Sequence, residues 1–261
     1  MTRKTLTAFS LVLLVVATAA APAFAQEPAP AKPMCPCPPP DPPPPVLQGS
    51  FSAGLALTTG NSDTSSFNLG FNLVYDPKAH SLFKADAFYL HSGNDGVATS
   101  DKAAARLRYE YKVTERAYAF LQLGYNRDRF MNMTYLITPM VGAGYSVVKE
   151  KTLDVTLEGS IGGAFEKDGG YDATSSGAFA VAQGLAWKIS PGATFTERAS
   201  GLWKTSDTSD CFYHFEVGLA ASLVKSFELK LTYLVDYRNL PNPPTKEKTD
   251  TTLIFAIVYK F

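Results

Sequence analysis

Residues 227–238 have the sequence Phe-Glu-Leu-Lys-Leu-Thr-Tyr-Leu-Val-Asp-Tyr-Arg. Every second residue from Phe227 to Tyr237 is apolar or aromatic, and the residues between them are polar or charged except for Leu234. Successive side chains of a β-strand point to opposite faces, so this period of two predicts a strand with one apolar and one polar face.

The same alternation recurs along the chain from Gly49 to its last residue, Phe261. It predicts twelve strands, at about 49–59, 64–75, 81–91, 102–113, 117–127, 134–148, 153–165, 177–189, 193–203, 211–224, 227–238 and 249–261. Gln183 interrupts the eighth strand, and Glu197 with Arg198 makes the ninth the weakest. Pro139 predicts a bulge or a break in pairing within the sixth.

The connections between these strands alternate in length. Tight turns are expected near 76–78, 114–116, 149–151, 190–192 and 225–226, and longer connections at 92–101, 127–133, 166–176, 204–210 and 239–248. The connection 60–63 belongs to the same side as these longer connections but is short. Short periplasmic turns and longer extracellular loops are typical of outer-membrane barrels, so we predict an all-β, twelve-stranded, antiparallel, up-and-down transmembrane β-barrel over residues 47–261.

Residues 1–25 have the features of a secretory signal peptide. Arg3 and Lys4 precede an apolar run from Leu11 to Ala21. Ala23 and Ala25 are the small residues that a signal peptidase requires, so cleavage is expected after Ala25. A membrane anchor is the alternative, but the run is shorter than the ~20 apolar residues that a spanning helix needs. No later segment is as long and apolar, so a membrane-embedded mature protein would have to be a closed barrel.

Residues 26–46 form a proline-rich segment that predicts an extended, disordered periplasmic tether with polyproline II character. Eleven of the 18 prolines lie between Pro28 and Pro45. Cys35 and Cys37 have only Cys211 as a further cysteine, which does not make a disulfide framework, and we expect neither a metal site nor a lipoprotein modification.

Composition excludes two classes of protein. The 261 residues include 24 basic and 24 acidic side chains and 46% hydrophobic residues, which rules out a disordered chain and a basic nucleic-acid binder. Removal of Arg3 and Lys4 with the signal would leave 22 basic against 24 acidic residues.

Alternation alone does not say which face meets lipid, and a secreted soluble lipid-binding barrel is an alternative. Aromatic residues at the strand ends of the apolar face predict a membrane girdle, with members Tyr75, Tyr111, Tyr145, Trp187, Trp203, Tyr213 and Tyr237. The opposite face predicts a charged lumen, and its charges could line a pore: Lys84, Asp86, Arg106, Arg108, Glu110, Asp154, Glu158, Glu216, Glu228, Lys230, Asp236 and Arg238. Charges are tolerated in a lumen, whereas a basic residue on the lipid face costs ~2–4 kcal/mol at mid-depth.

The last strand carries Phe255, Ile257, Tyr259 and Phe261 on one face. An amphipathic final strand that ends on an aromatic residue resembles the signal by which bacterial outer-membrane proteins engage the barrel-assembly machinery. An ordinary edge strand is the alternative, although an unpaired hydrophobic edge is unfavourable.

A family resemblance is carried by the stretch Gly54-Leu-Ala-Leu-Thr-Thr-Gly-Asn-Ser-Asp-Thr64, by Phe67-Asn-Leu69 and by Lys84-Ala-Asp-Ala-Phe-Tyr89. Over residues 47–261 the chain resembles domain-of-unknown-function family 481, Gram-negative outer-membrane proteins also labelled salt-induced. The resemblance implies a barrel without an established catalytic site.

No residue set predicts catalysis, a metal site or a cofactor. A lipid-modifying hydrolase of the phospholipase type is an alternative, because His91 is followed by Ser92, but adjacent strand residues point to opposite faces and could not form a dyad without a bulge. His80 is expected in a turn and His214 on the lumen face beside Glu216. No spacing typical of zinc ligands links these histidines.

We therefore predict an outer-membrane protein of a Gram-negative bacterium that is structural or a narrow, porin-like passive channel with a partly filled lumen. The expected partners are outer-membrane lipids and lipopolysaccharide, the barrel-assembly machinery and, through the proline-rich tether, the cell wall. No nucleic acid is expected to bind.

Overall fold

The computed structural model describes residues 46–59, 64–77, 79–94, 97–129, 131–243 and 247–261. The predicted signal peptide, the tether up to residue 45 and the motif at 60–63 lie outside these residues. Twelve strands are present: β1 Leu47–Thr59, β2 Thr64–Tyr75, β3 Ser81–Asn94, β4 Val97–Lys112, β5 Ala117–Asp128, β6 Met133–Lys149, β7 Leu153–Asp168, β8 Thr174–Ser190, β9 Ala193–Lys204, β10 Cys211–Val224, β11 Phe227–Arg238 and β12 Thr249–Lys260.

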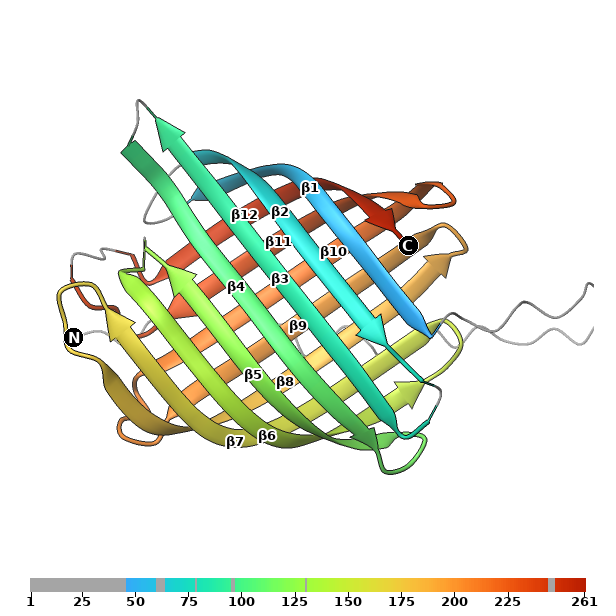
Figure 1. Ribbon diagram of the computed structural model, residues 1–261, viewed down its shortest axis with the longest axis horizontal. Coiled ribbons are helices and arrows are strands. Elements are labelled where there is room, and N and C mark those ends of the chain that lie inside the picture. The colour runs from blue at the N-terminus through green and yellow to red at the C-terminus, as the bar shows by residue number, and fades with distance from the viewer. Residues whose placement is uncertain (1–45, 60–63, 78, 95–96, 130, 244–246) are drawn as a thin grey trace, which may run out of the picture. The chain divides into compact units, whose positions relative to one another are not determined.

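The strands form one closed antiparallel barrel in which each strand pairs with its neighbours in sequence, and β1 pairs with β12 (Figure 1). The predicted fold class is confirmed. The strands tilt across the barrel in Figure 1, and the C-terminus lies at the end opposite the β3–β4 hairpin. We call the end with the connection 239–248 the long-loop end, and the end with the turns 191–192 and 225–226 the short-turn end.

The largest departure from the expected strand boundaries is at the β3–β4 hairpin. A long connection was expected at 92–101, but the two strands stay paired as far as Asn94 and Val97. A shift of register between Ser92 and Gly93 accommodates this extension. The prediction of a long loop here is wrong, because local turn-forming residues were outweighed by continued strand pairing.

Pro139 interrupts the pairing of β6 with β7 without shifting its register. Ile137 pairs with Phe165 and Met140 with Gly162, and the two pairs between them are missing from the ladder. Proline has no N–H to donate, so a local gap of this kind is the expected result.

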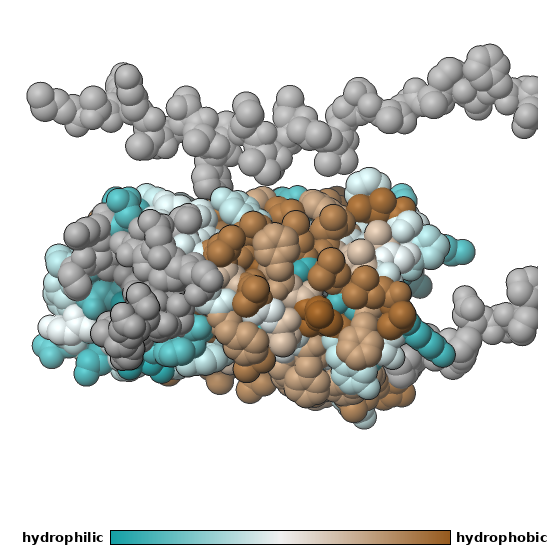
Figure 2. All heavy atoms as spheres, turned by 90° about the horizontal axis from the view of Figure 1, so that it is seen from above, coloured by the Kyte–Doolittle hydropathy of each residue, from teal (hydrophilic) through white to brown (hydrophobic). Residues whose placement is uncertain are grey.

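The outward face of the barrel is apolar. Phe51, Leu55, Leu121 and Ile161 are 54%, 65%, 57% and 65% exposed. Figure 2 shows hydrophobic residues gathered in a band across the middle of the visible face, with hydrophilic residues towards its ends. A band of this kind is what a lipid-facing barrel surface requires. The described residues include no helix long and apolar enough to cross a membrane.

Two apolar clusters lie inside the barrel. One is built around Leu136, Met140 and Ala164, and the other around Leu90 and Ile254. Leu90 and Ala164 are each 1% exposed. Apolar side chains thus occupy part of the interior that would otherwise be open to water.

Candidate functional site

The twelve charged residues predicted for the lumen all lie on the inward-facing positions of their strands. They alternate with outward-facing residues, as Glu228 and Lys230 alternate with the exposed Leu229 and Leu231. Many are joined in ion pairs: Lys84–Glu110 at 2.8 Å, Arg106–Asp86 at 2.8 Å, Arg108–Glu110 at 2.7 Å, Lys230–Glu216 at 3.6 Å and Lys260–Glu228. Asp154 is different, because its buried Oδ1 has no hydrogen-bond partner among the described residues.

One ion pair crosses the bore near the long-loop end. Lys102 of β4 donates to Asp236 of β11, and four strands separate β4 from β11 on one side and six on the other. Lys102 also lies 3.3 Å from Asp128, and His214 Nδ1 lies 2.6 Å from Asp236. Side chains from non-neighbouring strands can meet only inside the barrel, so this contact divides the lumen.

A second group beside it joins β7, β9 and β11. Arg238 lies 2.8 Å from Asp168 and 3.6 Å from Glu166, and Lys204 contacts both Glu166 and Asp210. The Arg238 guanidinium lies 4.9 Å from the ring centroid of Phe212. We call these two groups together the loop-end cluster: Lys102, Asp128, His214, Asp236, Glu166, Asp168, Lys204, Asp210 and Arg238.

Residues Asn242 and Pro243, which follow β11, contact this part of the barrel. Asn242 donates to Asp168 at 2.7 Å, and Asn132 donates to the backbone oxygen of Pro243 at 2.8 Å and to that of Gly169 at 3.1 Å. Asn132 has a φ of 55°, in the left-handed region that asparagine tolerates better than most residues. The loop-end cluster is therefore tied to the loops as well as to the walls.

Arg108 organises the lumen nearer the short-turn end. It donates to both oxygens of Glu158 at 2.7 and 3.0 Å, although β5 and β6 separate their strands. Its guanidinium lies 3.8 Å from the ring centroid of Phe120, and Tyr118 donates to Glu158 at 2.8 Å. This contact spans three strand intervals, unlike the pairs Lys84–Glu110 and Arg106–Asp86 between neighbouring strands β3 and β4.

The exposure of charged side chains varies along the lumen. At the long-loop end the side chains of Arg238, Asp168 and Lys204 are 1%, 3% and 5% exposed. Towards the short-turn end, Lys84 and Arg198 are 39% and 33% exposed. Arg108, which pairs with Lys84 in the ladder, is only 4% exposed, so buried charges lie in both halves of the lumen and the more accessible charges lie beside them towards the short-turn end.

Sequence patterns did not predict most of the loop-end cluster. Glu166 and Asp168 were expected in the connection 166–176, and Lys204 and Asp210 in the connection 204–210. Lys102 was expected to be the first residue of the fourth strand. All lie in or next to longer strands. The alternation of polar and apolar residues continues to these positions and could have predicted the longer strands. Only closure of the barrel brings their side chains together.

His80, His91 and Cys211 have separate surroundings. His91 faces outward and its ring stacks on Tyr89, with centroids 6.1 Å apart. His80 Nδ1 lies 3.1 Å from the backbone oxygen of Lys112, and Cys211 is buried as a free thiol. Within the described ranges, no group of three or more His, Cys, Asp or Glu residues could hold a metal ion.

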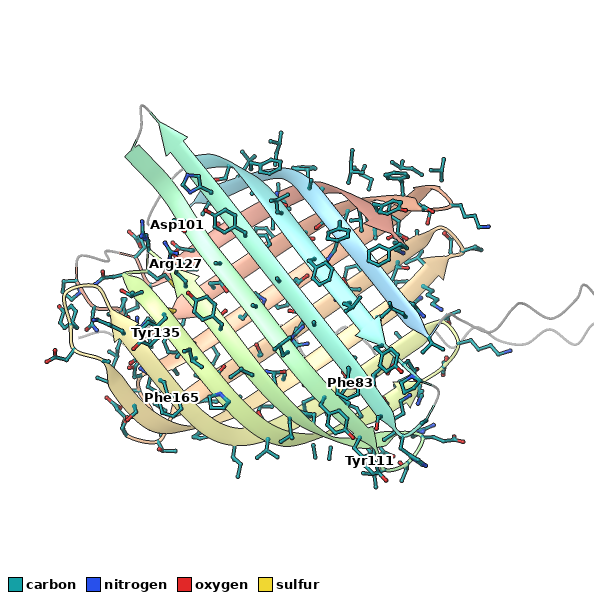
Figure 3. All side chains as sticks on the ribbon, in the orientation of Figure 1. Phe83, Asp101, Tyr111, Arg127, Tyr135 and Phe165 are labelled. Atoms are coloured by element: carbon teal, nitrogen blue, oxygen red, sulfur yellow. The ribbon has the colours of Figure 1, made fainter. Side chains whose placement is uncertain are left out.

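The predicted girdle residues lie on the outward face. Tyr75, Tyr111, Tyr145 and Trp187 are 43–50% exposed towards the short-turn end. Towards the long-loop end, Trp203 contacts Phe179 at 5.3 Å and Tyr213 at 5.6 Å between centroids, and Tyr213 contacts Tyr237 at 5.8 Å. In Figure 3, Phe83 and Tyr111 lie near the short-turn end, and Tyr135 and Phe165 lie nearer the long-loop end.

The last strand presents its proposed assembly residues to the outside. Phe255, Ile257, Tyr259 and Phe261 are 47%, 54%, 43% and 49% exposed.

At the rim of the long-loop end, Arg127 donates to Asp101 at 2.7 Å, and both residues are labelled in Figure 3.

Comparisons with known proteins agree with this architecture. A family model described as protein of unknown function, DUF481, matches residues 51–261. The structure of the NanC porin has a TM-score of 0.57 at 9% identity, covering 81% of this chain and 100% of that chain. The KdgM porin in complex with disordered oligogalacturonate has a TM-score of 0.51 at 11% identity, covering 81% and 99%. No curated protein matches the sequence.

Proposed function

The chain belongs to the DUF481 family, and we propose that it is a narrow passive channel of the outer membrane whose bore is restricted by the loop-end cluster. The observation that carries this proposal is the contact of Lys102 with Asp236 across the lumen. Two solved structures of similar fold are porins by name, which supports a role in transport.

The charges of the lumen favour small, hydrated solutes. Partly exposed charged side chains line the lumen towards the short-turn end, including Lys84, Arg106 and Glu216. Water-filled lumens keep such charges hydrated. Buried Arg238 and Asp168 leave little free space beside the transluminal pair. We therefore propose that ions and very small polar solutes pass, while larger solutes are excluded.

Conductance of the refolded protein in planar lipid bilayers tests the channel. We expect reproducible, voltage-independent steps that are much smaller than those of an open sixteen-stranded porin. Folded protein that gives no steps would overturn the channel and leave a structural role, in which the filled barrel serves as a scaffold.

The proposed location is the outer membrane of a Gram-negative bacterium. Lipids and lipopolysaccharide would surround the apolar belt, and the barrel-assembly machinery would bind the last strand through Phe255, Ile257, Tyr259 and Phe261. The proline-rich tether would face the periplasm, where it could contact the cell wall. Truncation of Phe261 should lower the yield of folded barrel in cells, and an unchanged yield would contradict this assembly role.

Catalysis is not part of the proposal. His91, the base of the hydrolase alternative, faces outward and contacts the ring of Tyr89. Refolded protein should release no fatty acid from phospholipid vesicles beyond a protein-free blank. Activity above the blank that is lost in His91→Ala would instead support the hydrolase.

A further inference from the structure

Two polar side chains interrupt the apolar outer surface of the barrel. Gln183 of β8 and Glu197 of β9 alternate with the outward residues of their strands, because Gln183 follows Val181 and precedes Leu185, and Glu197 pairs directly with Leu185 and Val217. Both side chains are half-buried. Neither has a hydrogen-bond or ion-pair partner within the part of the chain that the structure describes.

The two residues are diagonal neighbours. Gln183 pairs with Ala199, and Glu197 lies two residues further along β9 towards the short-turn end. Trp203 and Tyr213 are related by the same diagonal step, since Tyr213 pairs with Gly201, and their rings touch with centroids 5.6 Å apart. Gln183 and Glu197 therefore lie side by side at a similar height on the wall.

That height falls within the lipid-facing band. Towards the short-turn end, Trp187 of β8 is paired with Phe195 of β9. Towards the long-loop end, Phe179 is paired with Trp203. A carboxylate between these aromatic rows would be surrounded by acyl chains in an isolated barrel. Burial of a polar group without a hydrogen-bond partner is unfavourable.

The surface around the pair leaves room for a close approach. A Cβ added to Gly159 would meet no atom within 4 Å, and Gly159 lies on β7 diagonally beside Gln183. Ala199 presents only a methyl group on the other side. Small residues thus flank the polar pair, so the outer surface is less raised here than on β1 and β2, where large apolar side chains project.

We propose that this patch, formed by Gly159, Gln183, Glu197 and Ala199, is the interface through which a second copy of the chain binds in the membrane. A two-fold axis along the membrane normal, passing between Gln183 and Glu197, brings each residue opposite the other residue of the partner copy. The Gln183 amide then donates to the Glu197 carboxylate in both directions. The pair is complementary to itself, which favours a second copy over an unrelated partner.

The mass of the full-length protein in lipid nanodiscs, measured by native mass spectrometry, tests the interface. We expect a dimer for the wild type and a monomer for Gln183→Leu/Glu197→Leu, which suits the lipid face and should fold. The matched control is Leu69→Ala on β2, across the barrel from β8, and it should remain a dimer. A monomeric wild type, or a dimer that persists in the double variant, would overturn the proposal.

Cross-linking gives a second measurement that does not need the double variant to fold. Ala199→Cys, in a background with Cys35→Ser and Cys37→Ser, should form a covalent dimer in membranes with a short bismaleimide. Cys211 is buried and can stay. Absence of the dimer band, or an equal band for Leu69→Cys, would contradict an interface at β8 and β9.

Discussion

The ring of Phe261 lies over Gly49, and the backbones of these two residues exchange hydrogen bonds of 3.0 Å in both directions. This pair closes the seam between β1 and β12 at the short-turn end. The Phe261 ring also stacks on Phe51, with centroids 5.5 Å apart. The last residue of the chain is therefore part of the barrel wall.

Gly49→Val should destabilise the closed barrel. A Cβ at this position would lie 2.3 Å from the Phe261 ring, so the ring must leave its place against Phe51. Because the Phe261 ring is 49% exposed and can turn away, we expect a loss of about 1 kcal/mol, the lower end of the range for overpacking. Urea unfolding in lipid vesicles measures the loss, with Gly159→Ala as the control because its Cβ meets open space. Equal stabilities of the two variants would contradict the role of the seam.

Glu158→Leu should destabilise the protein more than the double variant Arg108→Met/Glu158→Leu. The Arg108 and Glu158 side chains are 4% and 13% exposed, and removal of one partner leaves the other charge buried. Breaking such a pair costs about 3–5 kcal/mol, whereas replacing both partners by apolar groups is often nearly neutral. Unfolding free energies of the wild type, the two single variants and the double variant provide the comparison. Additive losses would show that the two side chains act independently.

Leu231→Arg should lower stability in vesicles by about 2–4 kcal/mol if lipid covers the apolar face. Leu231 is an outward residue in the middle of β11. Ile189→Arg is the matched control, because Ile189 is also outward but lies beside the short turn, where the cost falls to about 0–1 kcal/mol. Similar losses for both variants would argue against a membrane around this face.

Asn132→Gly should release Pro243 from its contact with the loop after β5. Glycine adopts the φ of 55° readily, so this variant removes the hydrogen bonds to Pro243 and Gly169 without backbone strain. Trypsin should then cleave after Lys248 faster than in the wild type. An unchanged cleavage rate would show that these hydrogen bonds do not hold the loop.

Regular alternation made the wall of the barrel predictable. In β11, the strand from Phe227 to Arg238 has the predicted boundaries, because polar and apolar side chains separate cleanly. The start of β4 was missed, because Gly, Asp and Ser residues at 92–101 favour turns locally while the pairing of β3 with β4 continues.

The contacts of the lumen were less predictable. Lys102 and Asp236 are 134 residues apart, and only closure of the barrel brings them together. Gln183 and Glu197 were visible as interruptions of two strands, but their diagonal relationship depends on the register of β8 with β9. Patterns within single strands carry no information on either relationship.

The central claim is that the loop-end cluster restricts the bore, and single-channel conductance of Lys102→Ser/Asp236→Ser in planar bilayers tests it most directly. Removal of both side chains takes away the contact that crosses the lumen, so we expect larger conductance steps than those of the wild type. Folded double variant with the wild-type conductance would contradict the claim.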